Sequence, residues 1–495
     1  DSLAQAERWS RDFTLNGLRH ALREVIACFP VYRSYVDGVV KSSDRISIQR
    51  AVRRARTRNP LLGRAVFDFI RDTLLLRDPP SGPASDEYRA AQQQFVGKFQ
   101  QLTPPVMAKG CEDTSFYVYN RLISLNEVGG DPARFGWAPD RVHQFLGERA
   151  EKSPGGLSPL ATHDTKRGED VRARLNVLSE RPAEWGRRLA KWRELNRVHK
   201  VDLGDELLAP DPNEEYLIYQ TLIGTRPLAS DDDVGYVARI AAYMNKAVLE
   251  AKVHSSWINP EPEYLDAVKR FVEAILDPAQ SGEFLAELDA FVAIIARYGM
   301  VNSLAQTLVR CTGPGVPDFF QGTELWDLSL VDPDNRRPVD FSIRAEWLRS
   351  LDIGRVDLAD LVANMADGRI KLFLISRALR ARRDNASLFA AGKYVPLTVI
   401  GAKANHVFAF LRVHDSASAL VVVPRLLGGL NSGDSSLSES SIWGDTAIVL
   451  PPEMARYRWT NVFTDELILP TPSFSIDQIL HVLPVALLTT RNNQM

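Results

Sequence analysis

One segment gathers the side chains best suited to chemistry, the run Ala161–Asp170 with the sequence Ala-Thr-His-Asp-Thr-Lys-Arg-Gly-Glu-Asp. His163 can donate a hydrogen bond to a hydroxyl group, and Asp164 can accept from two vicinal hydroxyls. A carboxylate here can also oppose positive charge that develops in a transition state. Lys166 and Arg167 crowd this carboxylate, where stability alone has little use for them. The segment therefore predicts the carboxyl end of a strand at a catalytic site, with Asp164 as the catalytic group.

A structural alternative exists for the same residues. Asp164 or Thr165 could cap the N-terminus of a helix that begins before Glu169. Glu169 and Asp170 stand three and four residues before Arg172 and Arg174. That spacing is typical of an ion-pair ladder on an exposed helix face, which would have no part in chemistry.

The elements that must position this segment are of three kinds. Leu15, Leu18, Leu22 and Ile26 recur at helical spacing near the start, and helical periodicity returns from residue 169 to about residue 298. Short apolar runs that end in polar residues predict buried strands of a barrel at 105–108, 116–119, 157–162 and 316–324. Alternation at 406–413 and the apolar run 420–423 predict a terminal antiparallel β domain, with a Gly/Ser-rich loop at 428–441.

Composition sets limits on function. With 60 Lys and Arg against 62 Asp and Glu, the net charge is -2, so no global field would attract nucleic acid or a membrane surface. Cys28, Cys111 and Cys311 lie far apart, which favours neither disulfides nor a zinc site and is typical of a cytoplasmic protein. The histidines lack metal-ligand spacing and no phosphate-binding glycine loop occurs, so neither a metal nor a cofactor is predicted. The first residue, Asp1, begins within a helical pattern, and we expect the chain to continue from something upstream.

Several longer strings resemble a known family. The sequence is similar to maltooligosyltrehalose synthases, members of the α-amylase superfamily, over nearly its whole length. The supporting segments are 29–35, 105–117, 125–132, 161–170, 215–222, 254–257 and 314–327.

This resemblance implies an α/β fold class: the C-terminal part of a (β/α)8 barrel with large helical insertions, followed by an antiparallel β-sandwich domain. The expected regions are 1–102 as a helical insertion domain, 103–169 as barrel strands six and seven with their loops, 170–297 as a second helical insertion domain, 298–371 as the last barrel unit, and 372–495 as the C-terminal β-sandwich domain.

The resemblance also assigns site residues. His163-Asp164 matches the strand-seven motif, which makes Asp164 the transition-state-stabilising aspartate, while Gly315 through Glu324 match strand eight. Motifs for the nucleophile and the acid/base carboxylate are absent from this sequence, so we expect the chain to be the C-terminal portion of such an enzyme. The substrate-binding residues that we expect are His163, Lys166, Arg167, Lys109, Glu112, Asp113, Trp257, Trp326 and Glu324. Two alternatives stay open: Lys109 to Asp113 as a buried charge network, and the tryptophans as core packing.

The implied activity is intramolecular transglucosylation, which converts the reducing-end α-1,4 linkage of a maltooligosaccharide to the α-1,1 linkage of maltooligosyltrehalose, in trehalose biosynthesis. The implied partners are the maltooligosaccharide substrate and, functionally, a maltooligosyltrehalose-cleaving hydrolase; we expect a monomer. Two other functions remain as alternatives, a non-catalytic glucan-binding fragment and an α-glucan hydrolase.

Overall fold

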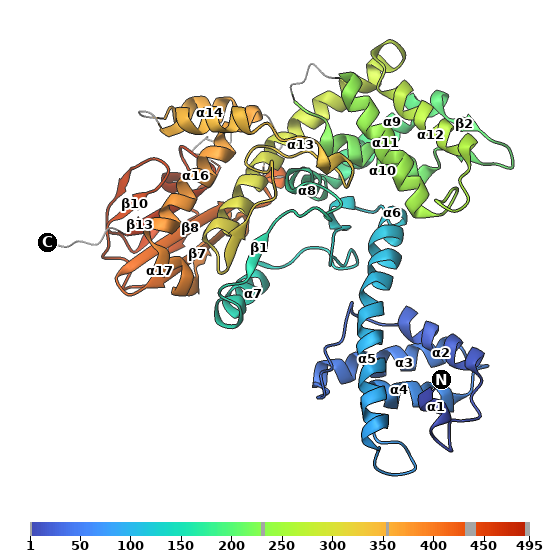
Figure 1. The fold of residues 1–495 in the computed structure, drawn as a ribbon. Helices are drawn as coiled ribbons and strands as arrows, with labels where there is room; N and C mark the ends of the chain where they lie inside the picture. Colours follow the sequence, from blue (N-terminus) through green and yellow to red (C-terminus); the bar gives the residue numbers. More distant parts are fainter. Residues whose placement is uncertain (1, 229–232, 353–355, 431–441, 491–495) are drawn as a thin grey trace. The chain divides into compact units, whose positions relative to one another are not determined.

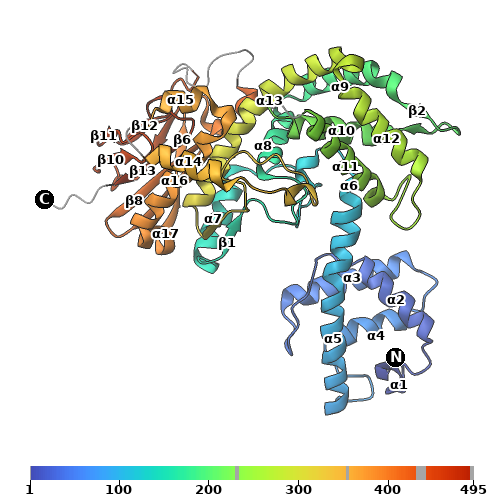
Figure 2. The same ribbon diagram turned by 45° about the horizontal axis from the view of Figure 1, so that its top comes forward.

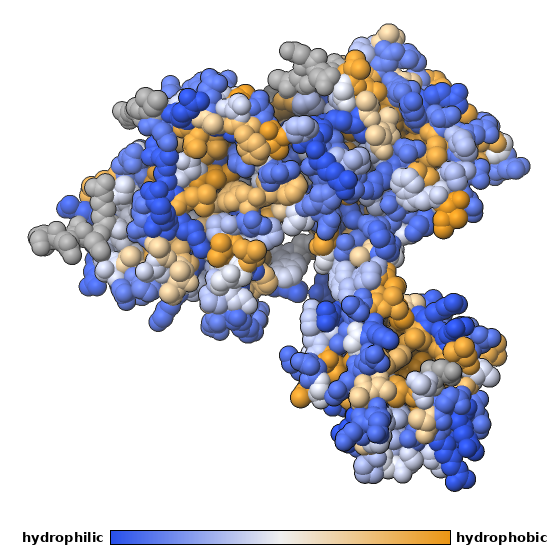
Figure 3. All heavy atoms as spheres, viewed as in Figure 1, coloured by the Kyte–Doolittle hydropathy of each residue, from blue (hydrophilic) through white to orange (hydrophobic). Residues whose placement is uncertain are grey.

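The computed structural model describes residues 2–228, 233–352, 356–430 and 442–490, which Figures 1 and 2 show as ribbons. The chain divides into two compact units, Asp1–Val118 and Tyr119–Met495, called unit 1 and unit 2 below. Hydrophilic residues cover most of the visible face of each unit, with smaller apolar patches between them (Figure 3). Among the described residues, no helix combines the length and hydrophobicity that crossing a bilayer requires.

Unit 1 is a helical bundle. Its helices bury the apolar residues that recur at spacings of three and four, such as Val25, Ile48, Phe67 and Ile70, in one core. Thr14 and Ser85 cap the N-termini of α2 and α5 through their side-chain oxygens. The helices are α1 (Ser2–Gln5), α2 (Leu15–Ala27), α3 (Ser42–Arg58), α4 (Arg64–Leu74), α5 (Asp86–Met107), the π-helical segment Ala108–Ser115 and α6 (Phe116–Val118).

Two of the expected strands are wrong. Residues 105–108 lie at the end of α5 and in the π-helical segment that follows, and Phe116–Val118 form α6. A strand satisfies its backbone hydrogen bonds only against a neighbouring strand. No described strand pairs with either segment, and the backbone satisfies its hydrogen bonds within helical turns instead.

The N-terminal half of unit 2 is mostly helical, as periodicity predicted for residues 169–298. The helix α13 runs through its centre and contacts α8, α9, α10, α12 and α16. These helices and their neighbours are α7 (Pro139–Lys152), α8 (Glu169–Asn176), α9 (Pro182–Asn196), α10 (Pro212–Thr225), α11 (Asp233–Ala251), α12 (Pro262–Ile275), α13 (Pro278–Thr312), α14 (Phe341–Asp352), α15 (Leu358–Ala363), α16 (Arg369–Asp384) and α17 (Ala386–Ala391).

Two short strands carry the segments with polar ends. The strand β1 (Leu157–Pro159) pairs in parallel with β4 (Val316–Asp318), and Leu157 lies opposite Val316. Strands were predicted at both places, and both are present. Because parallel strands end at the same edge, the residues after Pro159 and those after Asp318 leave the pair on one side. A separate antiparallel pair joins β2 (Val201–Asp202) and β3 (Leu208–Ala209).

The C-terminal part consists of antiparallel sheets, as alternation predicted. One sheet has the strand order β11-β10-β13-β8-β7-β5 and the other β12-β9-β6. Trp459 and Phe474 make an edge-to-face contact between the two sheets. The predicted Gly/Ser-rich loop lies outside the described residues from residue 431 onward. The strands are β5 (Lys393–Pro396), β6 (Thr398–Ile400), β7 (Val407–His414), β8 (Ala417–Pro424), β9 (Ala447–Val449), β10 (Trp459–Asn461), β11 (Leu467–Ile468), β12 (Ser473–Ser475) and β13 (Ala486–Thr490).

Candidate active site

Asp164 and His163 lie just beyond the carboxyl end of β1 and face solvent. The side chain of Asp164 is 84% exposed and that of His163 is 48% exposed, with 3.2 Å between His163 Nδ1 and Asp164 Oδ1. The turn is held locally, because Thr165 Oγ1 donates to the Thr162 carbonyl at 2.8 Å. Helix α8 begins only at Glu169, and its N-cap residue is Gly168. The alternative in which Asp164 or Thr165 caps this helix is therefore wrong.

A second segment, which follows β4, holds His163 from the other side. Asn335 Nδ2 donates to the carbonyl oxygen of His163 at 2.7 Å. Arg336 Nε donates to His163 Nε2 at 3.1 Å. The imidazole therefore contacts Asp164 through one nitrogen and Arg336 through the other.

Glu127 anchors the backbone behind this pair. One of its carboxylate oxygens accepts from the backbone N–H of Lys166 at 2.6 Å, and the other accepts from that of Arg167 at 3.3 Å. The guanidinium of Arg167 is buried and donates to the Ile123 carbonyl at 3.1 Å and to the Tyr243 hydroxyl at 2.9 Å. Lys166 is also buried. In this structure Arg167 braces the segment from behind and does not face solvent.

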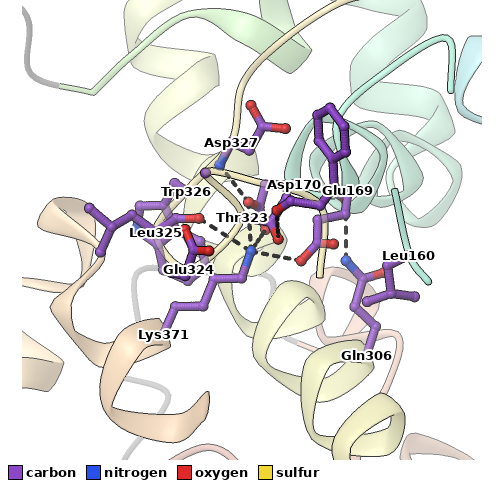
Figure 4. Close-up of polar contacts among 12 residues, drawn as sticks. Leu160, Glu169, Asp170, Gln306, Thr323, Glu324, Leu325, Trp326, Asp327 and Lys371 are labelled. Carbon is purple, nitrogen blue, oxygen red and sulfur yellow. Dashed lines mark hydrogen bonds and ion pairs between the residues drawn. The ribbon is translucent and has the colours of Figure 1, made fainter. Parts of the chain in front are cut away.

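Four buried charges meet where the segment enters α8, and Figure 4 shows three of them, Glu169, Asp170 and Lys371. Lys371 Nζ, on α16, is 2.8 Å from Glu169 Oε1 and 2.9 Å from Asp170 Oδ2. Arg310, on α13, donates to Glu169 Oε2 at 3.0 Å and to Oε1 at 3.3 Å. We call these four residues the buried tetrad; its two positive and two negative charges balance. The surface ion-pair ladder considered for Glu169 and Asp170 is thus wrong, because both carboxylates point into the core toward cations from α13 and α16.

The tetrad shifts the protonation of its members. Burial opposes charge on Glu169, but the charges of Lys371 and Arg310 outweigh it and lower the pKa of Glu169. Burial raises the pKa of Asp170, helped by the charge of Glu169. Burial likewise opposes the charge of Lys371, yet Asp170 and Glu169 outweigh it and raise the pKa of Lys371. The ammonium group is therefore held as a cation in the core.

The tetrad also joins the segments that follow the two strands. Asp170 Oδ2 accepts from the backbone N–H of Asp327 at 2.6 Å, and Lys371 Nζ donates to the Leu325 carbonyl at 3.3 Å. Gly168 N donates to the Ser329 carbonyl at 2.8 Å. A Cβ at Gly168 would lie 2.6 Å from the carbonyl oxygen of Asp327, so only glycine fits this approach. The backbone after β1 is therefore fixed to the backbone after β4.

The other expected substrate-binding residues of unit 2, Glu324, Trp326 and Trp257, differ in their contacts and in their exposure to solvent. Glu324 forms an ion pair with Arg344 at 3.1 Å. Trp326 is partly buried, donates from Nε1 to the Met365 carbonyl at 2.7 Å, and lies beside Lys371 (Figure 4). Trp257 lies between α11 and α12 and is 58% exposed. Of the two tryptophans, Trp257 alone presents most of its ring to solvent.

Lys109, Glu112 and Asp113 belong to unit 1, on the π-helical segment. Lys109 Nζ lies 2.6 Å from Asp113 Oδ2, and Tyr32 donates from its hydroxyl to the buried carboxylate of Glu112. The contact of Tyr32 with Glu112 braces the segment against the loop that follows α2. The side chain of Lys109 is 76% exposed, so its pair with Asp113 lies at the surface and is not the buried charge network considered as an alternative. In the described part of the chain, no three His, Cys, Asp or Glu side chains converge in a way that would hold a metal ion.

Several residues of the site escaped sequence reasoning. Lys371 has a recognisable signal, because it stands in the apolar run Ile370-Lys371-Leu372-Phe373-Leu374, where an unpaired lysine would be costly. Glu127, Arg310 and Arg336 have no such local signal. The partners through which these three residues join the site lie from about 40 to about 170 residues away along the chain, and spacing rules reach only a few residues.

Comparisons with known proteins agree on one family. No family profile matches the chain. Two curated relatives, from two strains of Mycobacterium tuberculosis, provisionally bear the name maltooligosyl trehalose synthase and are 36% identical over 367 residues, 74% of this chain and 42% of theirs. The solved maltooligosyltrehalose synthase of Arthrobacter ramosus matches at 34% identity and a TM-score of 0.77, covering 99% of this chain and 56% of that one. A Sulfolobus tokodaii structure titled as a hypothetical maltooligosyl trehalose synthase matches at 27% identity and a TM-score of 0.68, over 95% of this chain and 53% of that one. The chain thus spans about half the length of the proteins it matches, and it belongs to the maltooligosyltrehalose synthase family.

Proposed function

We propose that this chain supplies the transition-state-stabilising aspartate, Asp164, to an intramolecular transglucosylation. The reaction converts the reducing-end α-1,4 linkage of a maltooligosaccharide to the α-1,1 linkage of maltooligosyltrehalose. The observation that supports this most is the exposed His163–Asp164 pair beyond β1, on a backbone fixed by the buried tetrad. In the same proposal, β1 and β4 are the last two strands of a (β/α)8 barrel, whose functional residues follow its strands.

The chemistry divides the work among three carboxylates. Cleavage of the glycosidic bond with retention needs a nucleophile and an acid/base residue about 5–5.5 Å apart. We assign both to parts of the full-length enzyme outside these 495 residues. Asp164 forms no bond to the sugar; its negative charge opposes the positive charge at the anomeric carbon, and its oxygens accept from sugar hydroxyls. The imidazole of His163 is placed to orient that carboxylate.

The trehalose linkage forms in the second step. The released terminal glucose turns in the pocket, and its anomeric hydroxyl attacks the glycosyl-enzyme bond, which restores the free nucleophile. Water competes for the same bond, so the site must exclude it. In this proposal the helical region 170–297 forms a wall of that pocket, with Trp257 as a platform for a sugar face and Lys166, Glu324 and Trp326 as further sugar-contacting or supporting residues.

The test uses the full-length enzyme and maltopentaose. We expect maltotriosyltrehalose with little glucose as the product; abundant glucose would favour the α-glucan hydrolase instead. Asp164→Asn should lower kcat by about 10²–10³-fold or more, with an unchanged unfolding curve, because it keeps the shape and removes the charge. A near-normal rate in this variant would remove Asp164 from the mechanism.

A matched control exists in the chain. His414 and Asp415 form a second adjacent pair, with 3.3 Å between His414 Nδ1 and Asp415 Oδ2 and a similarly exposed carboxylate. They lie at the turn between β7 and β8 and belong to no part of the proposed site. Asp415→Asn should therefore leave kcat and the product ratio unchanged. Turnover by residues 1–495 alone would contradict the assignment of the other two carboxylates outside this chain.

A further inference from the structure

Arg336 lies on a turn that is anchored through a neighbouring carboxylate. The turn is the 3-10 helix Asp334–Arg336. The partly buried carboxylate of Asp334 accepts from Arg239 Nε at 2.8 Å and Nη2 at 2.9 Å, and from the backbone N–H of Leu330 at 2.8 Å. Burial opposes charge on Asp334, but Arg239 outweighs it and lowers the pKa of that carboxyl. The backbone that carries Arg336 is therefore anchored through the carboxylate of Asp334 to Arg239 and to the backbone of Leu330.

The contact between Arg336 and His163 determines which imidazole nitrogen carries the proton. A guanidinium group has only donors and no acceptor. Since Arg336 Nε lies 3.1 Å from His163 Nε2, that nitrogen must accept and must be unprotonated. The proton of the neutral ring then lies on Nδ1, which is 3.2 Å from Asp164 Oδ1. The ring therefore donates to the carboxylate of Asp164.

We propose that Arg336 is a positioning residue that holds His163 as the Nδ1-protonated tautomer, so that the imidazole orients the Asp164 carboxylate while leaving it negatively charged. This inference rests on the proposed function of Asp164. The same contact disfavours both states of the ring that carry a proton on Nε2, namely the Nε2-protonated tautomer and the doubly protonated ring. In either state, the N–H of His163 Nε2 would face the N–H of Arg336 Nε at 3.1 Å, with no acceptor between them. In the tautomer, the lone pair of Nδ1 would also face the Asp164 carboxylate.

The charge on Asp164 is the reason that the tautomer matters. A doubly protonated ring would place a full positive charge beside the carboxylate and offset the negative charge that the transition state needs. Arg336 instead presents its cation to the far side of the ring, where Asp332 Oδ2 also binds it at 3.3 Å. Lys246 in turn holds Asp332 Oδ1 at 3.0 Å. Positive charge is thereby placed behind His163 and separated from Asp164 by the neutral imidazole.

A double-mutant cycle in the full-length enzyme tests whether Arg336 acts through His163. Arg336→Met removes the donor but keeps the chain length, and we expect it to lower kcat on maltopentaose at least about tenfold with a much smaller change in KM. Arg336→Lys should recover much of that loss. In a His163→Asn background, Arg336→Met should have an effect of less than about twofold, because the residue that it orients is gone. Arg383→Met, on an exposed arginine paired with Asp384 at the far end of α16, is the control and should leave kcat unchanged.

Two kinetic outcomes would overturn the inference. An equal loss in the wild-type and His163→Asn backgrounds would show that Arg336 acts independently of His163. A loss confined to KM would indicate direct contact between Arg336 and the glucan.

A spectroscopic measurement separates this inference from the proposed function. In the full-length enzyme with 15N-labelled imidazoles, the His163 signal is identified by its absence from the His163→Asn variant. We expect a protonated Nδ1 and an unprotonated Nε2, and a shift toward protonated Nε2 in Arg336→Met. Finding Nε2 protonated in the wild type would overturn the inference, even if trehalose linkages form. Failure to form those linkages, with the Nδ1-protonated ring intact, would instead count against the proposed function alone.

Discussion

The ammonium group of Lys371 lies 2.8 Å from the carboxylate of Glu169, and neither side chain has any exposed surface. The two residues are separated by 202 positions in the sequence. Through Arg310 and Asp170, this contact joins α8, α13 and α16 beneath the loop that carries Asp164. A charge pair of this kind costs desolvation, and we infer that its role is to fix the placement of the segments that it connects.

Removing the ammonium group should therefore destabilise the protein strongly. Lys371→Met leaves Glu169 and Asp170 buried with Arg310 as the remaining cation of the tetrad, and we expect the free energy of unfolding to fall by about 3–5 kcal/mol. Denaturant unfolding of unit 2 measures this loss. Lys191→Met is the control and should leave the unfolding curve nearly unchanged, because the ion pairs of Lys191 with Glu283 and Glu287 lie at the surface, where water screens them. A loss of less than about 1 kcal/mol in Lys371→Met would mean that the tetrad does not hold these helices together.

A second buried carboxyl makes stability depend on pH. Burial raises the pKa of Glu214 from 4.5 to about 7, with a further contribution from Asp211. The folded protein therefore holds this proton more tightly than the unfolded chain does. The stabilising contribution of Glu214 is fully present below about pH 4.5, and it is lost as the pH rises through about 7. Over that window we expect the free energy of unfolding of the wild type to fall, relative to Glu214→Gln, on the order of 3 kcal/mol.

The comparison of the two unfolding curves isolates Glu214. Glutamine can still accept from the Tyr264 hydroxyl and from the Asp211 N–H, which are the contacts of the glutamate. Other titrating groups, such as Glu180 with its pKa of about 7, contribute equally to both proteins and cancel. Glu263→Gln, at an exposed position in the first turn of α12, should leave the pH dependence of the wild type intact. If the free energy of unfolding depends on pH in the same way in the wild type and in Glu214→Gln, the assignment of this pH dependence to Glu214 is wrong.

The sequence identified elements whose signals are local. The polar residues after β1, the alternation of β7 and the apolar run of β8 are all patterns within about ten residues, and the strands lie where these patterns predicted. Residues 105–108 were predicted as a strand because short apolar runs do not distinguish a strand from a buried helix. The structure places them at the end of α5 and the start of the π-helical segment. A strand would need a partner strand, which sequence spacing cannot reveal.

The candidate site shows the same division. His163 and Asp164 could be recognised because they are adjacent and follow a strand. The roles of Glu169 and Asp170 could not be recognised from the sequence. The same spacing to Arg172 and Arg174 is expected for an ion-pair ladder on an exposed helix and for a helix whose first two carboxylates are buried. Only the fold brings Lys371 to them, and long-range ion pairs leave no periodic trace in a single sequence.

The two tryptophans expected at the site should respond differently to truncation. Trp326→Ala removes a ring that packs beside Lys371 and leaves the Met365 carbonyl without its donor, so we expect a loss of about 3–5 kcal/mol in the free energy of unfolding. Trp257→Ala removes an exposed ring and should change stability by less than about 0.5 kcal/mol. If Trp257 stacks on the glucan as proposed, the same variant should raise KM for maltopentaose. An unchanged KM would remove Trp257 from the substrate-binding residues.

At Gly168 the backbone after β1 approaches the backbone after β4 closely. Its φ is ordinary for any residue, but a Cβ would lie 2.6 Å from the Asp327 carbonyl oxygen and 2.8 Å from Asp327 Oδ2. Gly168→Ala should therefore push the two segments apart and lower the free energy of unfolding by about 1–3 kcal/mol. Because Gly168 is only five residues from His163 and four from Asp164, kcat should fall as well. Gly186→Ala, where no atom lies within 4 Å in the exposed face of α9, should raise stability by up to about 1 kcal/mol. If Gly168→Ala matches Gly186→Ala in both stability and kcat, the close approach does not position the aspartate.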